Sequence, residues 1–198
     1  MMLCTLVMGM LDNNCYLLAD EDGTAVVIDP TMHADRIQKE IDSHGWHLGA
    51  ILLTHAHFDH VGAADRLAAN GAPIYLDPAD VAILPEMSHG KLTSPTVPYP
   101  DELTVGKLRF TVLRTPGHSP GSVCLLTDGL LFTGDTLFCG SCGRTDFVGG
   151  DPEAMLRSLR MLSNLNFEGR VLPGHDGETT LARERAENPY MRMARRGV

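Results

Sequence analysis

The first half of the chain alternates short apolar runs with turn-forming residues. "CYLLAD" and "AVVIDP" are separated by Glu21-Asp22-Gly23, a pattern typical of a β-hairpin. The opening "MMLCTLVMGM" is apolar but carries no basic residue, and Asp12 soon ends it, so we predict a strand and not a signal peptide. "AILLTH" predicts a buried strand, and "APIYLD" predicts another.

Helical periodicity appears in two stretches of this half. "ADRIQKEIDSHG" places Ile37 and Ile41 one turn apart and offers Gly45 as a helix stop. "HVGAADRLAANG" predicts a short helix that ends at Gly71. Residues 78–101 are rich in proline and lack periodicity, so we expect a long loop there.

The second half returns to strands. "ELTV", "LRFTVLRTPGHS", "SVCLLTD" and "GLLFTGD" follow one another, and "GRVLPGH" predicts a last strand. A helix is expected from Asp151, with Pro152 at its first position and Leu159 on its apolar face, and "TTLARERAENPYM" predicts a closing helix. Strand-rich stretches with interspersed helices indicate an α/β (α+β) fold in which two sheets pack together with helices outside.

Composition narrows the class of protein. The chain has 198 residues, which we read as one domain spanning 1–198. Lys plus Arg is 16 and Asp plus Glu is 25, so the net charge of −9 argues against nucleic-acid binding. No run approaches the ~18 apolar residues of a membrane helix. The 5 cysteines are scattered and do not suggest a disulfide framework. We therefore expect a cytoplasmic protein with no nucleic-acid or membrane partner; its oligomeric state stays open.

The most informative stretch is "LLTHAHFDHVG", Leu52 to Gly62. Residues two apart point the same way on an extended segment, so His55 and His57 can aim at one point beyond the strand end. Asp59 and His60, on the turn into the next helix, can face a second point. Imidazole and carboxylate groups suit zinc, iron, manganese or cobalt. A solvated polar turn is the alternative, and this density of ligand types argues against it.

Three further ligand types follow strand-like runs. They are His118 in "TPGHS", Asp135 in "LFTGD" and His175 in "LPGHD". Two of them come after Pro-Gly, which tightens the turn and lets the backbone approach a site closely. Together with the histidine cluster, these side chains suffice for two metals that share one carboxylate.

"THAHFDH", followed in order by His118, Asp135 and His175, resembles the metallo-β-lactamase superfamily over nearly the whole chain. The resemblance implies a four-layer αββα sandwich with two divalent metal ions at one edge of the sheets, zinc by preference, with iron or manganese as alternatives. It assigns one metal to His55, His57 and His118. It assigns the other metal to Asp59, His60 and His175. In this assignment Asp135 is the carboxylate that bridges the two metals.

That arrangement explains the chemistry that the resemblance implies. A metal can lower the pKa of bound water from about 15.7 to about 7, and two cations can also polarise a carbonyl. Asp135 would bridge the ions together with a water or hydroxide, and Asp59 would orient that hydroxide. Both aspartates are therefore expected to be catalytic.

"GDTLFCGSCGRTDFVGGD" resembles the segment after the bridging aspartate in glyoxalase II, the hydroxyacylglutathione hydrolases. The resemblance implies that Arg144 and Asp146 contact a small thioester substrate, S-lactoylglutathione or a related thiol ester. Asp146 stands where the family has tyrosine, and a structural Arg144–Asp146 pair is an equal alternative. "NCYLL" and "ERAENPYM" resemble the short bacterial members, which lack the C-terminal helical glutathione-binding domain of the longer ones. A thiol other than glutathione could then be the carrier.

Two other classes stay open. Persulfide dioxygenase has a very similar "GRTDF" stretch and would hold a single iron with His55, His118 and Asp135. A non-catalytic metal-binding protein of the same fold is the third class, and the intact ligand set disfavours it. The short C-terminus and the full dinuclear set favour hydrolysis.

Residues outside the motif receive simpler interpretations. Asp29, at the end of "VVID", is predicted to brace the histidine loop by accepting backbone N–H bonds. Cys139 and Cys142 are expected to be structural loop residues. The remaining histidines are expected on the surface or in loops: His33, His44, His47 and His89.

Overall fold

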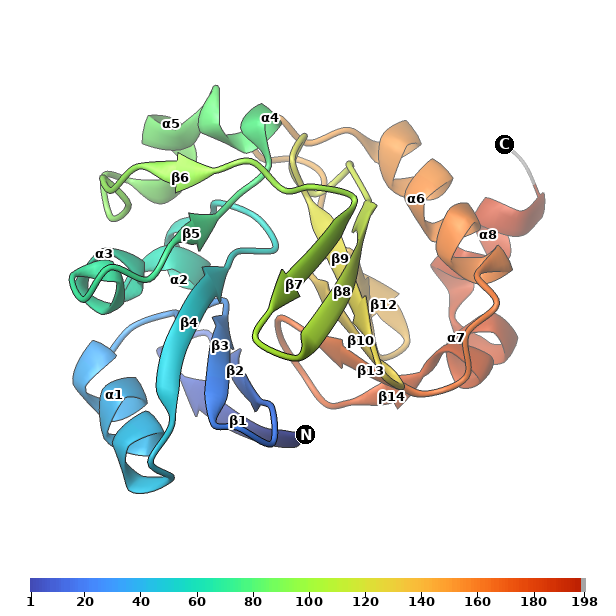
Figure 1. Ribbon diagram of the computed structural model, residues 1–198. Coiled ribbons are helices and arrows are strands. Elements are labelled where there is room, and N and C mark those ends of the chain that lie inside the picture. The colour runs from blue at the N-terminus through green and yellow to red at the C-terminus, as the bar shows by residue number, and fades with distance from the viewer. Residues whose placement is uncertain (197–198) are drawn as a thin grey trace.

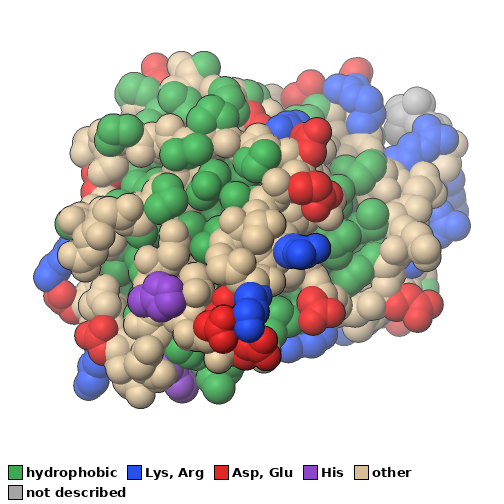
Figure 2. Space-filling view, viewed as in Figure 1, with side chains coloured by type: hydrophobic (Ala, Val, Ile, Leu, Met, Phe, Trp, Pro, Cys, Tyr) green, Lys and Arg blue, Asp and Glu red, His purple; other side chains and the backbone are tan. Residues whose placement is uncertain are grey.

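Two six-stranded β-sheets face each other in the computed structural model, which describes residues 1–196. Helices cover the outer side of each sheet, so the molecule has four layers in the order α, β, β, α (Figure 1). This is the predicted αββα sandwich. Charged side chains of both signs lie interspersed on the face shown in Figure 2, where hydrophobic side chains also gather.

The first sheet has the order β1-β2-β3-β4-β5-β6. Its strands are β1 (Met2–Met8), β2 (Asn13–Ala19), β3 (Thr24–Ile28), β4 (His47–Leu52), β5 (Ile74–Tyr75) and β6 (Thr96–Val97). The strands β1 to β3 pair antiparallel, and β3 to β6 pair parallel. The predicted opening strand and hairpin are confirmed, with Tyr16 opposite Ile28 across the β2–β3 pair.

The second sheet has the order β14-β13-β10-β9-β8-β7. Its strands are β7 (Glu102–Val105), β8 (Leu108–Arg114), β9 (Val123–Thr127), β10 (Leu130–Gly134), β13 (Arg170–Pro173) and β14 (Thr179–Thr180). A separate small hairpin joins β11 (Leu137–Phe138) to β12 (Ser141–Cys142). Each strand predicted in the second half is present.

Helices follow the strands on both outer faces. They are α1 (Ala34–Ser43), α2 (Phe58–Val61), α3 (Ala64–Ala68), α4 (Pro78–Val81), α5 (Leu84–Ser88), α6 (Pro152–Asn164), α7 (Leu181–Glu187) and α8 (Pro189–Arg196). Asp151 caps α6 by accepting hydrogen bonds from two backbone N–H groups, so this helix begins where the sequence predicts. Among residues 1–196, no helix has the length and apolar character to cross a membrane.

Three hydrophobic cores hold the layers together. Between the sheets, Leu18 and Val26 pack with Phe110 and Phe132, all of them fully buried. An outer core joins α1 to the first sheet through Ile37, and the other outer core joins α6 to the second sheet through residues such as Leu159. Each fully buried side chain of this size contributes about 1.5–3 kcal/mol. The central core therefore fixes the relative position of the two sheets.

The segment 78–101 is not the featureless loop that the sequence suggests. It contains the short helices α4 and α5 and the edge strand β6. Asp77 caps α4 by accepting a 3.0 Å hydrogen bond from the N–H of Ala79, and Pro78 fills the first helical position. Helices of one turn are too short to show a hydrophobic period, which explains the error.

Two predicted helices are each divided. The helix predicted over 60–71 is interrupted between α2 and α3, where the N–H of Ala63 bonds to the carbonyl of Pro30 at 2.9 Å. The closing helix divides into β14, α7 and α8. Asn188 leaves the helical conformation because it precedes Pro189, which disfavours helical backbone at the residue before it.

Backbone hydrogen bonds tie the loops of both sheets together at one edge. The carbonyl of Thr54, just beyond β4, accepts a 2.9 Å bond from the N–H of Val123 in β9. The N–H of Gly174 bonds to the carbonyl of Gly134 at 2.8 Å, and the carbonyl of Gly174 accepts the N–H of Asn14 at 2.8 Å. The histidine-bearing strand ends of both halves therefore meet at this edge.

Candidate metal centre

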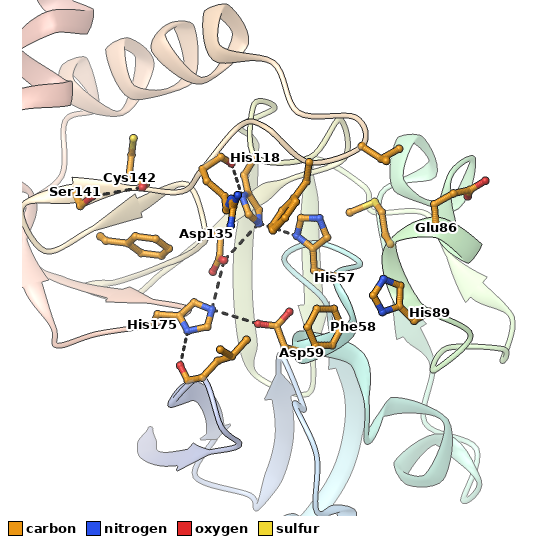
Figure 3. Close-up of a pocket in the computed structure, with 16 residues that line it drawn as sticks. His57, Phe58, Asp59, Glu86, His89, His118, Asp135, Ser141, Cys142 and His175 are labelled. Atoms are coloured by element: carbon orange, nitrogen blue, oxygen red, sulfur yellow. Dashed lines mark hydrogen bonds and ion pairs between the residues drawn. The ribbon is translucent and has the colours of Figure 1, made fainter.

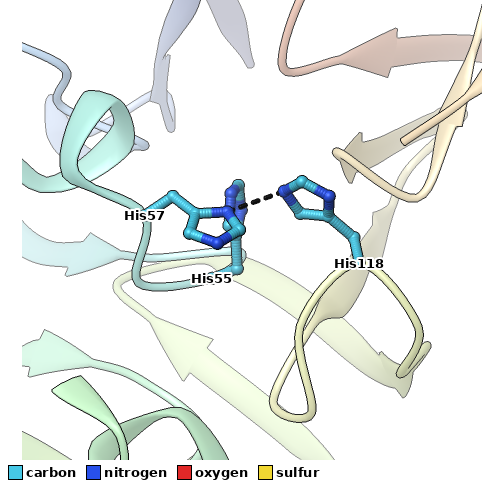
Figure 4. Close-up of side chains that lie close together, drawn as sticks. All are labelled: His55, His57 and His118. Carbon is cyan, nitrogen blue, oxygen red and sulfur yellow. Dashed lines mark hydrogen bonds between the residues drawn. The ribbon is translucent and has the colours of Figure 1, made fainter. Parts of the chain in front are cut away.

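The first group of donors consists of three histidines from two distant loops. His55 and His57 follow β4, and His118 follows β8. One ligand nitrogen from each lies within 4.8 Å of the others, and all three side chains are buried. The rings converge on one point, with Nδ1 of His57 2.7 Å from Nε2 of His118 (Figure 4). This is the predicted first set.

The second group combines Asp59, His60 and His175, whose donor atoms also lie within 4.8 Å of one another. Nε2 of His60 is 3.3 Å from Nε2 of His175, and Asp59 Oδ2 is 3.5 Å from the latter nitrogen. Asn13, at the start of β2, was not predicted from the sequence. Its amide donates a 2.9 Å hydrogen bond to Asp59 Oδ2. An asparagine after a tight turn carries no pattern that distinguishes this role from capping.

Asp135 lies between the two groups. Its Oδ2 is 3.4 Å from Nε2 of His118 and 3.5 Å from Nε2 of His175 (Figure 3). Its Oδ1 is 3.4 Å from Nε2 of His60. The carboxylate therefore touches imidazoles of both groups. That is the position that the sequence resemblance assigns to a bridging ligand.

Two buried polar atoms support a metal in this centre. Nε2 of His55 and Oδ1 of Asp135 have no hydrogen-bond partner within the part of the chain that the structure describes. A buried polar atom without a partner is costly, and imidazole nitrogen and carboxylate oxygen are the donors that zinc and similar ions take. The residues present therefore fit a pair of divalent cations.

Outer hydrogen bonds aim the inner nitrogens. Three of the histidines use Nδ1 to reach an acceptor away from the centre, which leaves Nε2 facing inward. The bonds run from His60 to the carboxylate of Asp29 at 3.0 Å, from His118 to the carbonyl of Arg144 at 2.8 Å, and from His175 to the carbonyl of Leu11 at 2.9 Å.

The two groups differ in their electrostatics. Burial and neighbouring imidazoles hold the pKa of His55 well below its usual range, and burial lowers the pKa of His57 to about 4. These rings are neutral near pH 7 and offer lone pairs. Burial also disfavours charge on His60, but Asp135 and other carboxylates outweigh it and raise the pKa to about 9. Burial lowers the pKa of His118 as well, so the first group is a neutral three-imidazole set, and the second is balanced by carboxylates.

Asp29 braces the histidine loop, as predicted. Its Oδ1 accepts the backbone N–H of Thr54 at 2.7 Å, and its Oδ2 accepts the Thr54 hydroxyl at 2.6 Å. The same Oδ2 meets Nδ1 of His60 at 3.0 Å. Asp29 therefore fixes both the chain before His55 and the ring of a ligand in the second group.

Asp80 is a second brace that sequence reasoning missed. Its fully buried carboxylate accepts the N–H of Ala56 at 2.9 Å, the hydroxyl of Ser119 at 2.9 Å and the N–H of Gly121 at 2.6 Å. One carboxylate thus joins the loop of His55 and His57 to the loop of His118. Its segment was expected to be a loop, and nothing in the sequence separates Asp80 from a helix-capping aspartate.

The Pro-Gly turns bring backbone close to the site, as predicted. A Cβ at Gly174 would collide with Oδ1 of Asp135 and lie 2.8 Å from Cε1 of His60. Gly117, with a φ of 146°, leaves no room for a side chain against Met155 of α6. Only glycine fits at either position.

Arg144 and Asp146 form a bidentate ion pair. Nε and Nη2 of the guanidinium donate to the two carboxylate oxygens at 2.6 Å each, and Arg144 lowers the pKa of Asp146 to about 2. The guanidinium also lies 4.0 Å from the ring centroid of Phe147. The structure therefore shows the charge pair, while contact of either residue with substrate stays a prediction.

The donors open into a cavity of about 600 Å³ (Figure 3). Its floor includes His57, Asp59 and Asp135, and Arg144 lies at its wall. His89, expected on the surface or in a loop, is exposed; it also lines the cavity and stacks on Phe58 with ring centroids 5.0 Å apart. A further donor group lies outside the cavity lining: Cys4, Glu40 and His44.

Comparisons with known proteins identify the family and similar structures. Residues 8–175 match the metallo-beta-lactamase superfamily. The chain is 35% identical over 196 residues to the hydroxyacylglutathione hydrolase GloC of Haemophilus influenzae, across 90% of this chain and 92% of that protein. It superposes on TTHA1623 in a di-iron-bound form with a TM-score of 0.84 and 38% identity, across 94% of this chain and 99% of the other. ETHE1 from Myxococcus xanthus gives a TM-score of 0.82 and 33% identity, across 96% and 84% of the two chains.

Proposed function

Because the chain belongs to the metallo-beta-lactamase superfamily, we propose that it is a metal-dependent hydrolase that cleaves a thioester. One observation carries the proposal: the Asp135 carboxylate lies within 3.5 Å of imidazole nitrogens from both donor groups. A shared carboxylate is typical of two-metal hydrolytic centres. The similarity to a hydroxyacylglutathione hydrolase supports a thioester as the substrate.

The donor groups would hold two divalent cations, and zinc suits the three-histidine set. Iron is an alternative, because a similar protein has been solved in a di-iron-bound form. Bound cations would lower the pKa of a water and polarise the thioester carbonyl. His55, His57 and His118 would hold one cation, and the second set would hold the other with Asp135 between them.

The chain's own side chains position the reactants. Asp59 lines the cavity and is anchored by the Asn13 amide at 2.9 Å, so its carboxylate can orient the attacking water. The imidazoles of the first group are neutral near pH 7, so they need not lose a proton before they bind a cation. The lining of the cavity is largely apolar, and a bound substrate would displace water from it.

Turnover of defined thioesters tests the proposal. The metal-loaded protein is expected to hydrolyse S-lactoylglutathione with a high KM. It is also expected to accept thioesters of smaller thiols. The reason is that uniform binding of the thiol part, which is remote from the carbonyl, acts on KM more than on kcat. Release of free thiol measures the rate. A fully metal-loaded protein that cleaves no thioester would refute this function.

Persulfide dioxygenase is the second candidate. A single iron with open positions could be held by His55, His118 and Asp135. Nε2 of His55 has no hydrogen-bond partner among the described residues, and Nε2 of His118 lies 3.4 Å from Oδ2 of Asp135. Similarity to ETHE1 from Myxococcus xanthus leaves this candidate in place. Oxygen uptake with glutathione persulfide, measured beside thioester cleavage on one iron-loaded sample, separates the two functions.

A further inference from the structure

Large apolar side chains stay exposed around the mouth of the cavity. Leu11 is 54% exposed, Phe147 is 46% exposed and Val148 is 60% exposed, and all three line the cavity. Met10, next to Leu11 in the same turn, is 98% exposed. A single exposed hydrophobic residue is ordinary, but several around one opening mark a binding surface.

Leu11, Phe147 and Val148 form an apolar wall of the cavity, with Leu11 on one side and Phe147 on the other. The Leu11 side of this apolar wall lies against the metal donors. Leu11 lies in the turn between β1 and β2, and its carbonyl accepts the 2.9 Å hydrogen bond from Nδ1 of His175. Phe138 of β11 approaches the other side of that histidine, with ring centroids 5.9 Å apart. The apolar surface therefore begins directly beside the second donor group.

The Phe147 side of the wall lies close to the first donor group. The ring centroid of Phe147 lies 5.4 Å from that of His57, in an edge-on arrangement. Gly149 packs the loop tightly, because a Cβ there would lie 2.7 Å from Ile83 and 2.8 Å from Pro120. The loop is thus seated on α4–α5 and the His118 loop, and it holds Phe147 over the floor.

Most of this wall is carbon, although Arg144 also lines the cavity. Arg144 donates from one edge of its guanidinium, through Nε and Nη2, to Asp146 at 2.6 Å each, and the guanidinium lies 4.0 Å from the ring centroid of Phe147. Phe58 and Met87 continue the lining with carbon surface. A substrate group that lies against the carbon surface gains from burying its own carbon.

We propose that this wall is an acyl-binding subsite for an apolar acyl group of a thioester. The inference rests on the proposed function, since it takes the thioester carbonyl to lie at the donors. Biological thiol carriers are peptide-like or nucleotide-like and charged, so apolar walls do not complement them. The acyl chain is the apolar part of such a molecule, and it is bonded directly to the carbonyl carbon. Phe147 and Leu11 are the specificity-determining residues.

A series of N-acetylcysteamine thioesters from acetyl to octanoyl tests the subsite on the metal-loaded protein. The expected rise in kcat/KM is about fourfold for each methylene that the wall buries, which corresponds to about 0.8 kcal/mol per CH2 group. Phe147→Ala and Leu11→Ala should lower kcat/KM for octanoyl far more than for acetyl. Val97→Ala is the matched control, because Val97 is 40% exposed in β6 and does not line the cavity.

Binding of ketone analogues, in which CH2 replaces the thioester sulfur, separates this inference from the proposed function. Calorimetry should show affinity that rises with acyl length and falls in Phe147→Ala. Thioester cleavage with no dependence on acyl length overturns the subsite and leaves the hydrolase. Tighter binding of longer ketones without cleavage of any thioester supports the subsite and overturns the hydrolase. An equal loss of slope in Val97→Ala overturns the assignment to this wall.

Discussion

The carboxylate of Asp80 accepts a 2.9 Å hydrogen bond from the backbone N–H of Ala56, the residue between His55 and His57 of the candidate metal centre. Through Ser119 and Gly121 the same carboxylate also holds the loop of His118. The two loops come from different sheets. Asp80 therefore sets the distance between donors that the chain places far apart, although it is outside the cavity lining.

Asp80→Asn is expected to lower metal affinity and turnover by about 10- to 100-fold, the range for loss of a partner that orients ligands. The amide would direct an N–H toward groups that are themselves donors, at a cost of about 1–3 kcal/mol. Metal titration and urea unfolding measure the two effects. Asp77→Asn is the control, because asparagine also caps a helix well. Equal losses in both variants would contradict the bracing role.

Burial raises the pKa of Asp80 from 3.8 to about 6. The folded state then binds this proton more tightly than the unfolded chain does. The contribution of Asp80 to the free energy of unfolding is therefore largest below about pH 4 and is lost as the pH rises through about 6. The difference in unfolding free energy between wild type and Asp80→Asn, both with chelator, should decrease over this interval and stay constant above it. A difference that grows with pH would show the opposite shift.

Each chain is expected to bind two divalent ions, with Asp135 shared between them. Asp135→Ala should abolish turnover and leave at most one ion, because its carboxylate touches both donor groups. Metal analysis of the purified protein gives the count. Asp146→Ala serves as the control and should retain both ions. A single ion in wild type, with His60 and Asp59 unengaged, would refute the dinuclear centre.

The exposed pair Arg144–Asp146 leads to a prediction about charge recognition. Asp146→Ala frees the guanidinium and should lower KM for a thioester that carries a carboxylate, such as S-lactoylglutathione. Arg144→Ala should raise that KM while kcat changes less, because ground and transition state share such a contact. Lactoyl-N-acetylcysteamine, which has no carboxylate, should show neither change. Unaltered KM values in both variants would leave the pair a purely structural one.

The sequence alone predicted two packed sheets with helices outside and supplied the candidate donor residues, and its resemblance to a known superfamily supplied the αββα order. Short apolar runs bounded by turn residues marked the strands, and the Ile37 and Leu159 faces marked helices, since these patterns follow from which parts of an element are buried. The spacing of His55, His57, Asp59 and His60 is local and therefore readable. Asp29 was also recognisable, because it directly follows the apolar strand-like run "VVI".

Tertiary structure decided what depends on contacts between distant segments. Asp80, Asn13 and His89 carry no local pattern, and their roles arise only when separate loops meet. One-turn helices such as α4 are too short to show a hydrophobic period, so the sequence predicts a loop for residues 78–101 where the structure has short helices. The apolar wall of Leu11 and Phe147 joins turns 136 residues apart (147 − 11). Their exposure is a property of the folded surface, because a sequence shows that a side chain is apolar but not that folding leaves it uncovered.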